Sequence, residues 1–305
     1  MNWKNEISAA ADRIAGYAQV TPVMESHALG LDYPVELKLE QMQHTGSFKA
    51  RGAFNTLLSS DVPAAGVVAA SGGNHGAAAA YAAQTLGFPA KIFVPELAGP
   101  SKIALIEQTG ADLSVVSGEY ANALTAAQDH EARTGAMQIH AYDAPGTVAG
   151  QGTCFAEWEA QGLKADTVLV AVGGGGLIAG AFAWLQNARK VVAVEPETSC
   201  ALNAALQAGE PVDVRVSGIA ANALGARRIG SICFGLAQGM TSVLVSDEAI
   251  AQAQQLLWQT HRILVEPAGA TALAALLSGA YTPAHDEKVA VLVCGGNISP
   301  DPFMG

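Results

Sequence analysis

Residues 45–53 read Thr-Gly-Ser-Phe-Lys-Ala-Arg-Gly-Ala, and Lys49 is the most informative residue of this stretch. It lies where an extended segment, residues 35–40, gives way to a helical one. A lysine that is desolvated there offers the neutral amine that a Schiff base with an aldehyde cofactor requires. The alternative is an ordinary helix N-terminus, in which Thr45 or Ser47 caps the helix and Lys49 is a solvated surface lysine.

A second segment, Ser71-Gly72-Gly73-Asn74-His75-Gly76, follows the apolar residues 66–70 and precedes an alanine-rich helical stretch, residues 77–86. This pattern predicts a strand, a turn of small residues and then a helix N-terminus. The backbone N–H groups of such a turn favour an anion, for example a substrate carboxylate. The alternative is a plain strand-to-helix connection, but that connection does not need the polar side chains of both Asn74 and His75.

The third segment is Gly173-Gly174-Gly175-Gly176, between a predicted strand, residues 167–172, and a predicted helix, residues 177–185. Four glycines let the backbone approach a phosphate group closely, and the helix N-terminus supplies partial positive charge. A dinucleotide site is the competing interpretation. The sequence after the glycines has no acidic residue at the spacing that would bind the ribose, because the next acidic residue, Glu195, stands before a proline.

Together these segments resemble the serine/threonine dehydratase and serine racemase group of pyridoxal-phosphate enzymes, which have the tryptophan-synthase-β-like fold. A fourth matching segment is Cys294-Gly295-Gly296-Asn297, and the four motifs occur in the family's order. The resemblance implies pyridoxal 5'-phosphate as cofactor, a small amino acid as substrate and a homodimer as assembly. It extends from about residue 8 to the C-terminus.

The resemblance also implies a role for each matched residue. Lys49 would hold the cofactor and then remove the α-proton of the substrate. The implied cofactor contacts are Phe48, Lys49, Asn74, Gly173, Gly174, Gly175, Gly176, Leu177 and Cys294, with the glycines at the phosphate, Asn74 at the phenolic oxygen and Cys294 at the ring nitrogen. The implied substrate contacts are Ser71, Gly72, Asn74 and His75.

The order of apolar and helical segments predicts an α/β protein with an open, largely parallel sheet covered on both faces. We expect strands at residues 67–70, 91–94, 113–116, 167–172, 191–194, 243–245 and 289–293. The resemblance implies two domains: a large one of residues 1–65 and 144–305, which binds the cofactor, and a smaller inserted one of residues 66–143, which binds substrate.

Composition narrows the classes of partner. The 305-residue chain carries 16 Lys and Arg against 27 Asp and Glu, a formal net charge of −11, which argues against nucleic acid and anionic membranes as partners. Its four cysteines are scattered and form no C-x-x-C pair, so neither a zinc site nor a disulfide framework is predicted. The polar residues 1–6 do not form a signal peptide, and we expect a cytoplasmic protein.

Three departures from the family pattern bear on the reaction. Racemases of the group place a second serine, the acid/base of the opposite face, where this chain has Gly72. Cys294 stands where a serine is usual, and a thiol cannot hold a proton on the ring nitrogen as a carboxylate does. Ala201 stands where metal-activated racemases have an aspartate six residues after Glu195, so no divalent metal site is expected.

Three hypotheses follow. The first is an ammonia-lyase that eliminates the β-hydroxyl of threonine, serine, a 3-hydroxyaspartate or an aryl-serine. The second is a racemase or a β-replacement synthase of the same fold. The third is a nucleotide-binding or other non-catalytic small-molecule-binding protein that uses the glycine loops.

Overall fold

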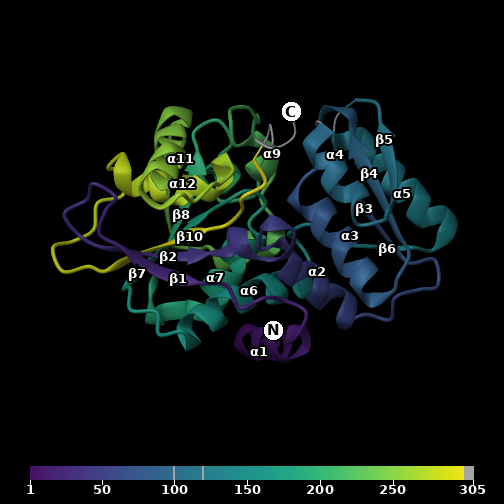
Figure 1. Cartoon of the computed structure of the whole chain (residues 1–305), viewed down its shortest axis with the longest axis horizontal. Helices are drawn as coiled ribbons and strands as arrows, with labels where there is room; N and C mark the ends of the chain where they lie inside the picture. The colour runs from purple at the N-terminus through teal and green to yellow at the C-terminus, as the bar shows by residue number, and fades with distance from the viewer. Residues whose placement is uncertain (99, 119, 299–305) are drawn as a thin grey trace.

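The computed structural model describes residues 1–98, 100–118 and 120–298. It contains two open sheets that lie beside one another (Figure 1). The larger sheet has the order β1-β2-β10-β7-β8-β9, and the smaller has the order β5-β4-β3-β6. Only β1 and β2 pair antiparallel; every other pairing within the two sheets is parallel. The predicted α/β class with largely parallel sheets is confirmed.

The strands are short, and several of them are apolar. In chain order they are β1 Val23–Ser26, β2 Val35–Leu39, β3 Val67–Ala70, β4 Ala90–Pro95, β5 Asp112–Val116, β6 Met137–Gln138, β7 Thr167–Ala171, β8 Lys190–Pro196, β9 Thr241–Val245 and β10 Val289–Val293. Each of the seven predicted strands is present, with ends that differ from the prediction by at most two residues. β3, β7 and β10 are buried along their whole length, as expected for parallel strands covered on both faces.

The helices cover both sheets. They are α1 Trp3–Ile14, α2 Lys49–Leu58, α3 Asn74–Leu86, α4 Pro100–Glu107, α5 Tyr120–Thr134, α6 Pro145–Ala160, α7 Gly176–Leu185, α8 Ala201–Ala208, α9 Ala221–Leu224, α10 Ser231–Leu236, α11 Asp247–His261 and α12 Pro267–Leu277, with short 3-10 turns η1 Glu40–Met42, η2 His44–Gly46, η3 Glu96–Ala98 and η4 Gln186–Ala188. In Figure 1, α11 and α12 lie on one side of the larger sheet, and α6, α7 and α1 lie on the other. No described helix has the length and apolar character needed to cross a membrane.

A buried ionic network holds the start of α2 in place. Arg51 donates from Nε and Nη2 to the two carboxylate oxygens of Glu40, both at 2.8 Å, and its Nη2 also reaches Glu157 of α6 at 2.9 Å. Lys38 of β2 donates to the other oxygen of Glu157 at 2.5 Å. Burial opposes ionisation of Glu40, but the charge and hydrogen bonds of Arg51 lower its pKa. Because Arg51 lies two residues after Lys49, this network fixes the helix that carries the lysine.

Candidate active site

The segment before Lys49 makes a tight turn against the end of β10. Thr45 has φ 59° and Gly46 has φ 73°, both in the left-handed region. Ser47 then forms an isolated bridge with Gly295, and the N–H of Phe48 donates to the carbonyl oxygen of Cys294 at 3.2 Å. These contacts bring two segments that are far apart in the sequence into one site.

Lys49 does not behave as a solvated surface lysine. Its Nζ donates to the carbonyl oxygen of Ala141 at 2.7 Å and lies 5.1 Å from the centre of the Phe48 ring. Burial lowers the pKa of Lys49 to about 8, although Cys294 and Glu266 act in the opposite direction. Helix α2 has no side-chain cap, so the alternative in which Thr45 or Ser47 caps it is wrong.

The second motif forms the predicted strand, turn and helix. β3 ends at Ala70 and α3 begins at Asn74, with Gly73 as its N-cap residue. The N–H of Gly73 donates to Ser71 Oγ at 3.1 Å. The imidazole of His75 is buried and its Nε2 lies 2.9 Å from the carbonyl oxygen of Ile139. Burial and the charge of Lys49 lower the pKa of His75 to about 3, so the ring is neutral and Nε2 carries the proton that is donated.

Close packing of neighbouring side chains leaves no room for a Cβ atom at Gly72. A Cβ atom at this position would overlap with the Cβ of Ala98 and would lie 2.9 Å from Cγ1 of Val94. Its φ is not in the left-handed region, in contrast to those of Gly46 and Gly175. The turn therefore packs directly onto the end of β4 and the following turn η3.

The third motif is a loop closely surrounded by other segments. Gly175 has φ +94°, and a Cβ there would lie 2.5 Å from Sγ of Cys233. A Cβ on Gly173 would meet the Cα of Leu224 at 2.9 Å, and one on Gly174 would overlap with the ring of Tyr142. Helix α7 begins at Gly176, one residue before the predicted start, so the first N–H groups of the helix belong to this loop.

Glu195 does not fit the dinucleotide interpretation. Its buried carboxylate accepts hydrogen bonds from the backbone N–H groups of Leu202 and Asn203, both at 2.8 Å. Burial raises the pKa of Glu195 to about 7. Within the part of the chain that the structure describes, no three His, Cys, Asp or Glu side chains are placed to hold a metal ion.

Glu266 and Asn297, for which the sequence predicted no contact, complete the site. Asn74 Nδ2 donates to a carboxylate oxygen of Glu266, and Asn297 Nδ2 donates to Asn74 Oδ1 at 2.9 Å. Cys294, three residues before Asn297, is buried and its Sγ donates to the carbonyl oxygen of Ala268 at 3.3 Å. Burial, reinforced by Glu266, raises the pKa of the Cys294 thiol, which is therefore neutral.

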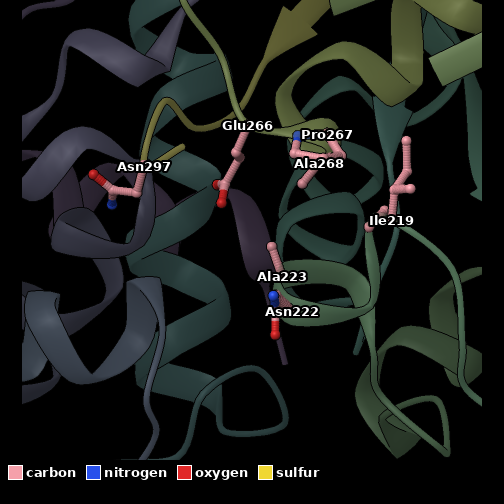
Figure 2. A pocket seen from close by; sticks show the side chains of 8 residues that line it. Ile219, Asn222, Ala223, Glu266, Pro267, Ala268 and Asn297 are labelled. Atoms are coloured by element: carbon pink, nitrogen blue, oxygen red, sulfur yellow. The ribbon is translucent and has the colours of Figure 1, made fainter. Parts of the chain in front are cut away.

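A small cavity of about 50 Å³ opens beside this cluster (Figure 2). Glu266 and Asn297 form part of its wall, and small apolar side chains form much of the rest. The labelled members in Figure 2 are Ile219, Asn222, Ala223, Glu266, Pro267, Ala268 and Asn297. Among the described residues, the lining thus has one acidic side chain and no basic one.

Three buried polar atoms near the lysine and the glycine loop have no hydrogen-bond partner among the described residues: Thr45 Oγ1, Ser47 Oγ and Gln151 Oε1. A Cβ on Gly176 would lie 2.5 Å from this oxygen of Gln151. Buried polar atoms are normally paired, and unpaired ones call for an explanation such as a bound group. Thr45 and Ser47 lie just before Lys49, and Gln151 lies against Gly176 and near the carbonyl of Ala141, so these atoms fit a site for a polar cofactor.

Known proteins resemble the chain along nearly its full length. A family model described as pyridoxal-phosphate dependent enzyme matches residues 14–295. A phenylserine dehydratase of Ralstonia pickettii is 34% identical, over 97% of this chain and 94% of that protein. An L-threonine ammonia-lyase of Geobacter sulfurreducens is 34% identical, over 96% of this chain and 75% of that protein.

Solved structures agree with these relatives. Maize serine racemase superimposes with a TM-score of 0.92 at 30% identity, covering 97% of this chain and 94% of that one. A threonine deaminase from "T.th." superimposes with a TM-score of 0.90 at 35% identity, covering 98% of this chain and 99% of that one. The fold is therefore shared by proteins named for elimination and by proteins named for racemisation.

Proposed function

The chain belongs to the family of pyridoxal-phosphate-dependent enzymes, and from this premise we propose that it is an ammonia-lyase. It eliminates the β-hydroxyl of L-threonine, L-serine or a related β-hydroxy amino acid and releases a 2-oxo acid and ammonia. The proposal rests on a difference between Lys49 and Gly72 in their capacity to transfer a proton. Lys49 supplies one proton-transferring group, and Gly72, pressed against Ala98, has neither a side chain nor the space for one.

The described residues fit the cofactor. The glycine loop and the first N–H groups of α7 form a bare backbone cradle suited to a phosphate group. Asn74 offers N–H groups for the phenolic oxygen, and Phe48 lies next to the lysine. When bound, pyridoxal phosphate supplies an aldehyde that reacts with amines and a ring that accepts the electron pair of the substrate α-carbon.

Lys49 is suited to the role of base. A lysine with an ordinary pKa of 10.5 is almost fully protonated at neutral pH, whereas the pKa of about 8 leaves a useful fraction of neutral amine. The carbonyl of Ala141 accepts a hydrogen bond from Nζ without adding a negative charge that would favour the ammonium form. The amine can therefore take the proton from the substrate α-carbon.

Cys294 supports elimination over a reaction that needs a long-lived carbanion. Its thiol is neutral because burial raises its pKa, and its Sγ donates to Ala268. A neutral thiol leaves the ring nitrogen a weaker acceptor of negative charge than a carboxylate partner would. Prompt departure of a β-hydroxyl relieves that charge.

Racemisation is the second candidate, because maize serine racemase has the same fold at a TM-score of 0.92. Racemisation by two bases requires an acid on the face opposite Lys49. Gly72 occupies the position of that acid in the racemase pattern and cannot transfer a proton. This difference favours elimination.

The cavity beside Asn74 narrows the substrate class. Its described wall combines Ile219, Ala223 and Pro267 with the acidic Glu266 and contains no basic residue. A β-substituent with its own carboxylate would lack a cationic partner there and would face Glu266. We therefore favour an uncharged substituent over the carboxylate of 3-hydroxyaspartate. The relatives named for threonine and phenylserine agree with this choice.

For the domain organisation, we propose a smaller domain of residues 66–143 inserted between residues 1–65 and 144–305. All strands of the four-stranded sheet fall within the inserted range, and all strands of the six-stranded sheet fall outside it. Residues 299–305 of the larger domain lie outside the described residues. The homodimer implied by the family is part of the same proposal.

A panel of L-threonine, L-serine, L-threo-3-phenylserine and L-threo-3-hydroxyaspartate tests the proposal. The holoenzyme is incubated with each amino acid, and the 2-oxo acid and ammonia are quantified. We expect equal amounts of both products from at least one of the first three substrates and little turnover of the fourth. Absence of 2-oxo acid from all four would overturn the assignment as an ammonia-lyase. Preference for 3-hydroxyaspartate would overturn the argument that the cavity disfavours a carboxylate on the β-carbon.

A further inference from the structure

The side chain of Asn297 connects three parts of the site. Its Nδ2 donates to the carbonyl oxygen of Thr45 at 2.7 Å and to Asn74 Oδ1 at 2.9 Å. Thr45 belongs to the turn before Lys49, and Asn74 begins α3, so Asn297 joins both to the end of β10. Figure 2 shows Asn297 and Glu266 in the wall of one pocket, on separate segments.

These contacts determine the orientation of the Asn74 amide, that is, on which side its oxygen and its nitrogen lie. The shape of an asparagine side chain does not distinguish its oxygen from its nitrogen, so the hydrogen-bond partners decide. The carbonyl of Thr45 only accepts, which requires Asn297 to present Nδ2. The second hydrogen on that nitrogen then requires an acceptor on Asn74, namely Oδ1.

Asn74 is therefore held with Nδ2 on the side away from Asn297. One hydrogen of this group goes to Glu266, and the second can be donated to another acceptor. A flipped Asn74 would place its nitrogen against the nitrogen of Asn297 and its oxygen against the carboxylate oxygen of Glu266. Both contacts would be repulsive.

Two glycines make room for this arrangement. A Cβ on Gly295 would overlap with Oε1 of Glu266 and lie 3.2 Å from Nδ2 of Asn74. A Cβ on Gly46 would overlap with the side-chain oxygen of Asn297. The bare backbone at both positions lets the partly buried Asn297 meet the buried Asn74 and Glu266, where an unpaired amide would be costly.

We infer that Asn297 is a positioning residue, which orients the amide of Asn74 so that the N–H not bonded to Glu266 faces the cofactor. This inference rests on the proposed function, in which Asn74 donates to the phenolic oxygen of pyridoxal phosphate. Asn297 acts through Asn74 and would contact no reacting atom. Without the hydrogen bond from Asn297, the contact with Glu266 alone orients the amide of Asn74, and the amide is held less firmly.

A double-mutant cycle tests the inference. Asn297→Asp replaces the donor with an acceptor of nearly the same shape, and it is made in the parent chain and in an Asn74→Ala chain. Asn5→Asp, the same change at an exposed site on α1, is the matched control. The readouts are the visible absorption spectrum of bound pyridoxal phosphate and its dissociation constant, neither of which depends on turnover.

In the parent chain we expect Asn297→Asp to shift the absorption band and weaken cofactor binding by about tenfold to a hundredfold, the size of one charge-assisted hydrogen bond. In the Asn74→Ala chain the same change should alter binding by less than about threefold. Asn5→Asp should alter neither property. Asn297→Ala adds no charge and should also shift the absorption band and weaken cofactor binding. It replaces the aspartate variant if that variant does not fold.

Equal effects of Asn297→Asp in both chains would overturn the inference, because Asn297 would then act through the Thr45 turn alone. No effect in the parent chain would also overturn it. Failure of the proposed function has a different signature, since the unmodified chain would then release no 2-oxo acid from the substrate panel, whatever the Asn297 variants do to cofactor binding.

Discussion

Nζ of Lys49 lies 2.7 Å from the carbonyl oxygen of Ala141, on the segment that leads from the smaller sheet back to the larger one. Gln151 approaches the same oxygen with its Nε2 at 3.4 Å. The lysine is thus held by a neutral acceptor in a poorly solvated place, and its pKa falls to about 8 chiefly through burial. Burial, with a neutral rather than an anionic acceptor, distinguishes this amine from that of an ordinary surface lysine.

Replacing this amine should abolish the reaction. Lys49→Ala removes both the attachment point of the cofactor and the base, and general acid–base catalysis alone is worth about a hundredfold to ten-thousandfold. We expect no Schiff-base absorption band and a loss of turnover of at least that size, with an unchanged melting temperature. Lys164→Ala, at an exposed lysine, is the control. Substantial activity in Lys49→Ala would refute the assignment of the lysine.

The pH dependence of cofactor incorporation should report the pKa of Lys49. Below about pH 8 the amine is mostly protonated and cannot attack the aldehyde, and above this value it is mostly neutral. The rate at which pyridoxal phosphate combines with the cofactor-free protein should therefore rise with pH and level off, with a midpoint near the lysine's pKa of about 8. Blocked lysine in solution, with a pKa of about 10.4, is the control. A midpoint in the protein close to that of the control would contradict the burial argument.

The sequence predicted this part of the site well, for a physical reason. Lys49, the turn at Ser71 and the glycine loop each lie between a strand and a helix, and local patterns of apolar residues locate such junctions. Seven strands were found close to their predicted positions. The two-residue strand β6 and the antiparallel strand β1 were missed, because their pairing partners rather than their own residues define them.

The glycine loop should be sensitive to any side chain at Gly175. Gly175→Asp combines an unfavourable φ of +94° with a clash against Cys233 and a negative charge near the phosphate site. We expect loss of cofactor during dialysis. Gly209→Asp is a matched control, since it has φ +76° and open space around its Cβ. It should cost only about 1 kcal/mol of stability and leave cofactor content unchanged. Retention of cofactor by Gly175→Asp would argue against the cradle.

Gly72 should tolerate a serine poorly. A Cβ there overlaps with Ala98, so Gly72→Ser should destabilise the protein by about 1–3 kcal/mol through overpacking. Ala98→Gly in the same chain removes the overlapping carbon and should restore part of the stability. Thermal unfolding of the single and double variants measures this. If Gly72→Ser alone is as stable as the parent, the turn is packed less tightly against Ala98 than described.

The long-range features of the site could not be predicted from the sequence. Asn297 was visible only as the last residue of a short motif, and nothing local indicated that it and Glu266 both bond to Asn74. The same holds for Tyr142, whose ring covers Gly174. Such contacts depend on how the two sheets and their helices pack, which periodicity within one segment does not encode. The need for a glycine at position 72 could not be predicted either, because Ala98, which leaves no room for a Cβ there, lies on a separate turn.

The most direct test of the central claim compares elimination with racemisation in the unmodified enzyme. The holoenzyme is incubated with L-serine and L-threonine, and the initial rates of formation of 2-oxo acid and of D-configured amino acid are measured by chiral chromatography. With one base at Lys49 and no acid at Gly72, elimination should be faster by about a hundredfold or more. Formation of D-amino acid faster than 2-oxo acid would show that the protein is a racemase and not an ammonia-lyase.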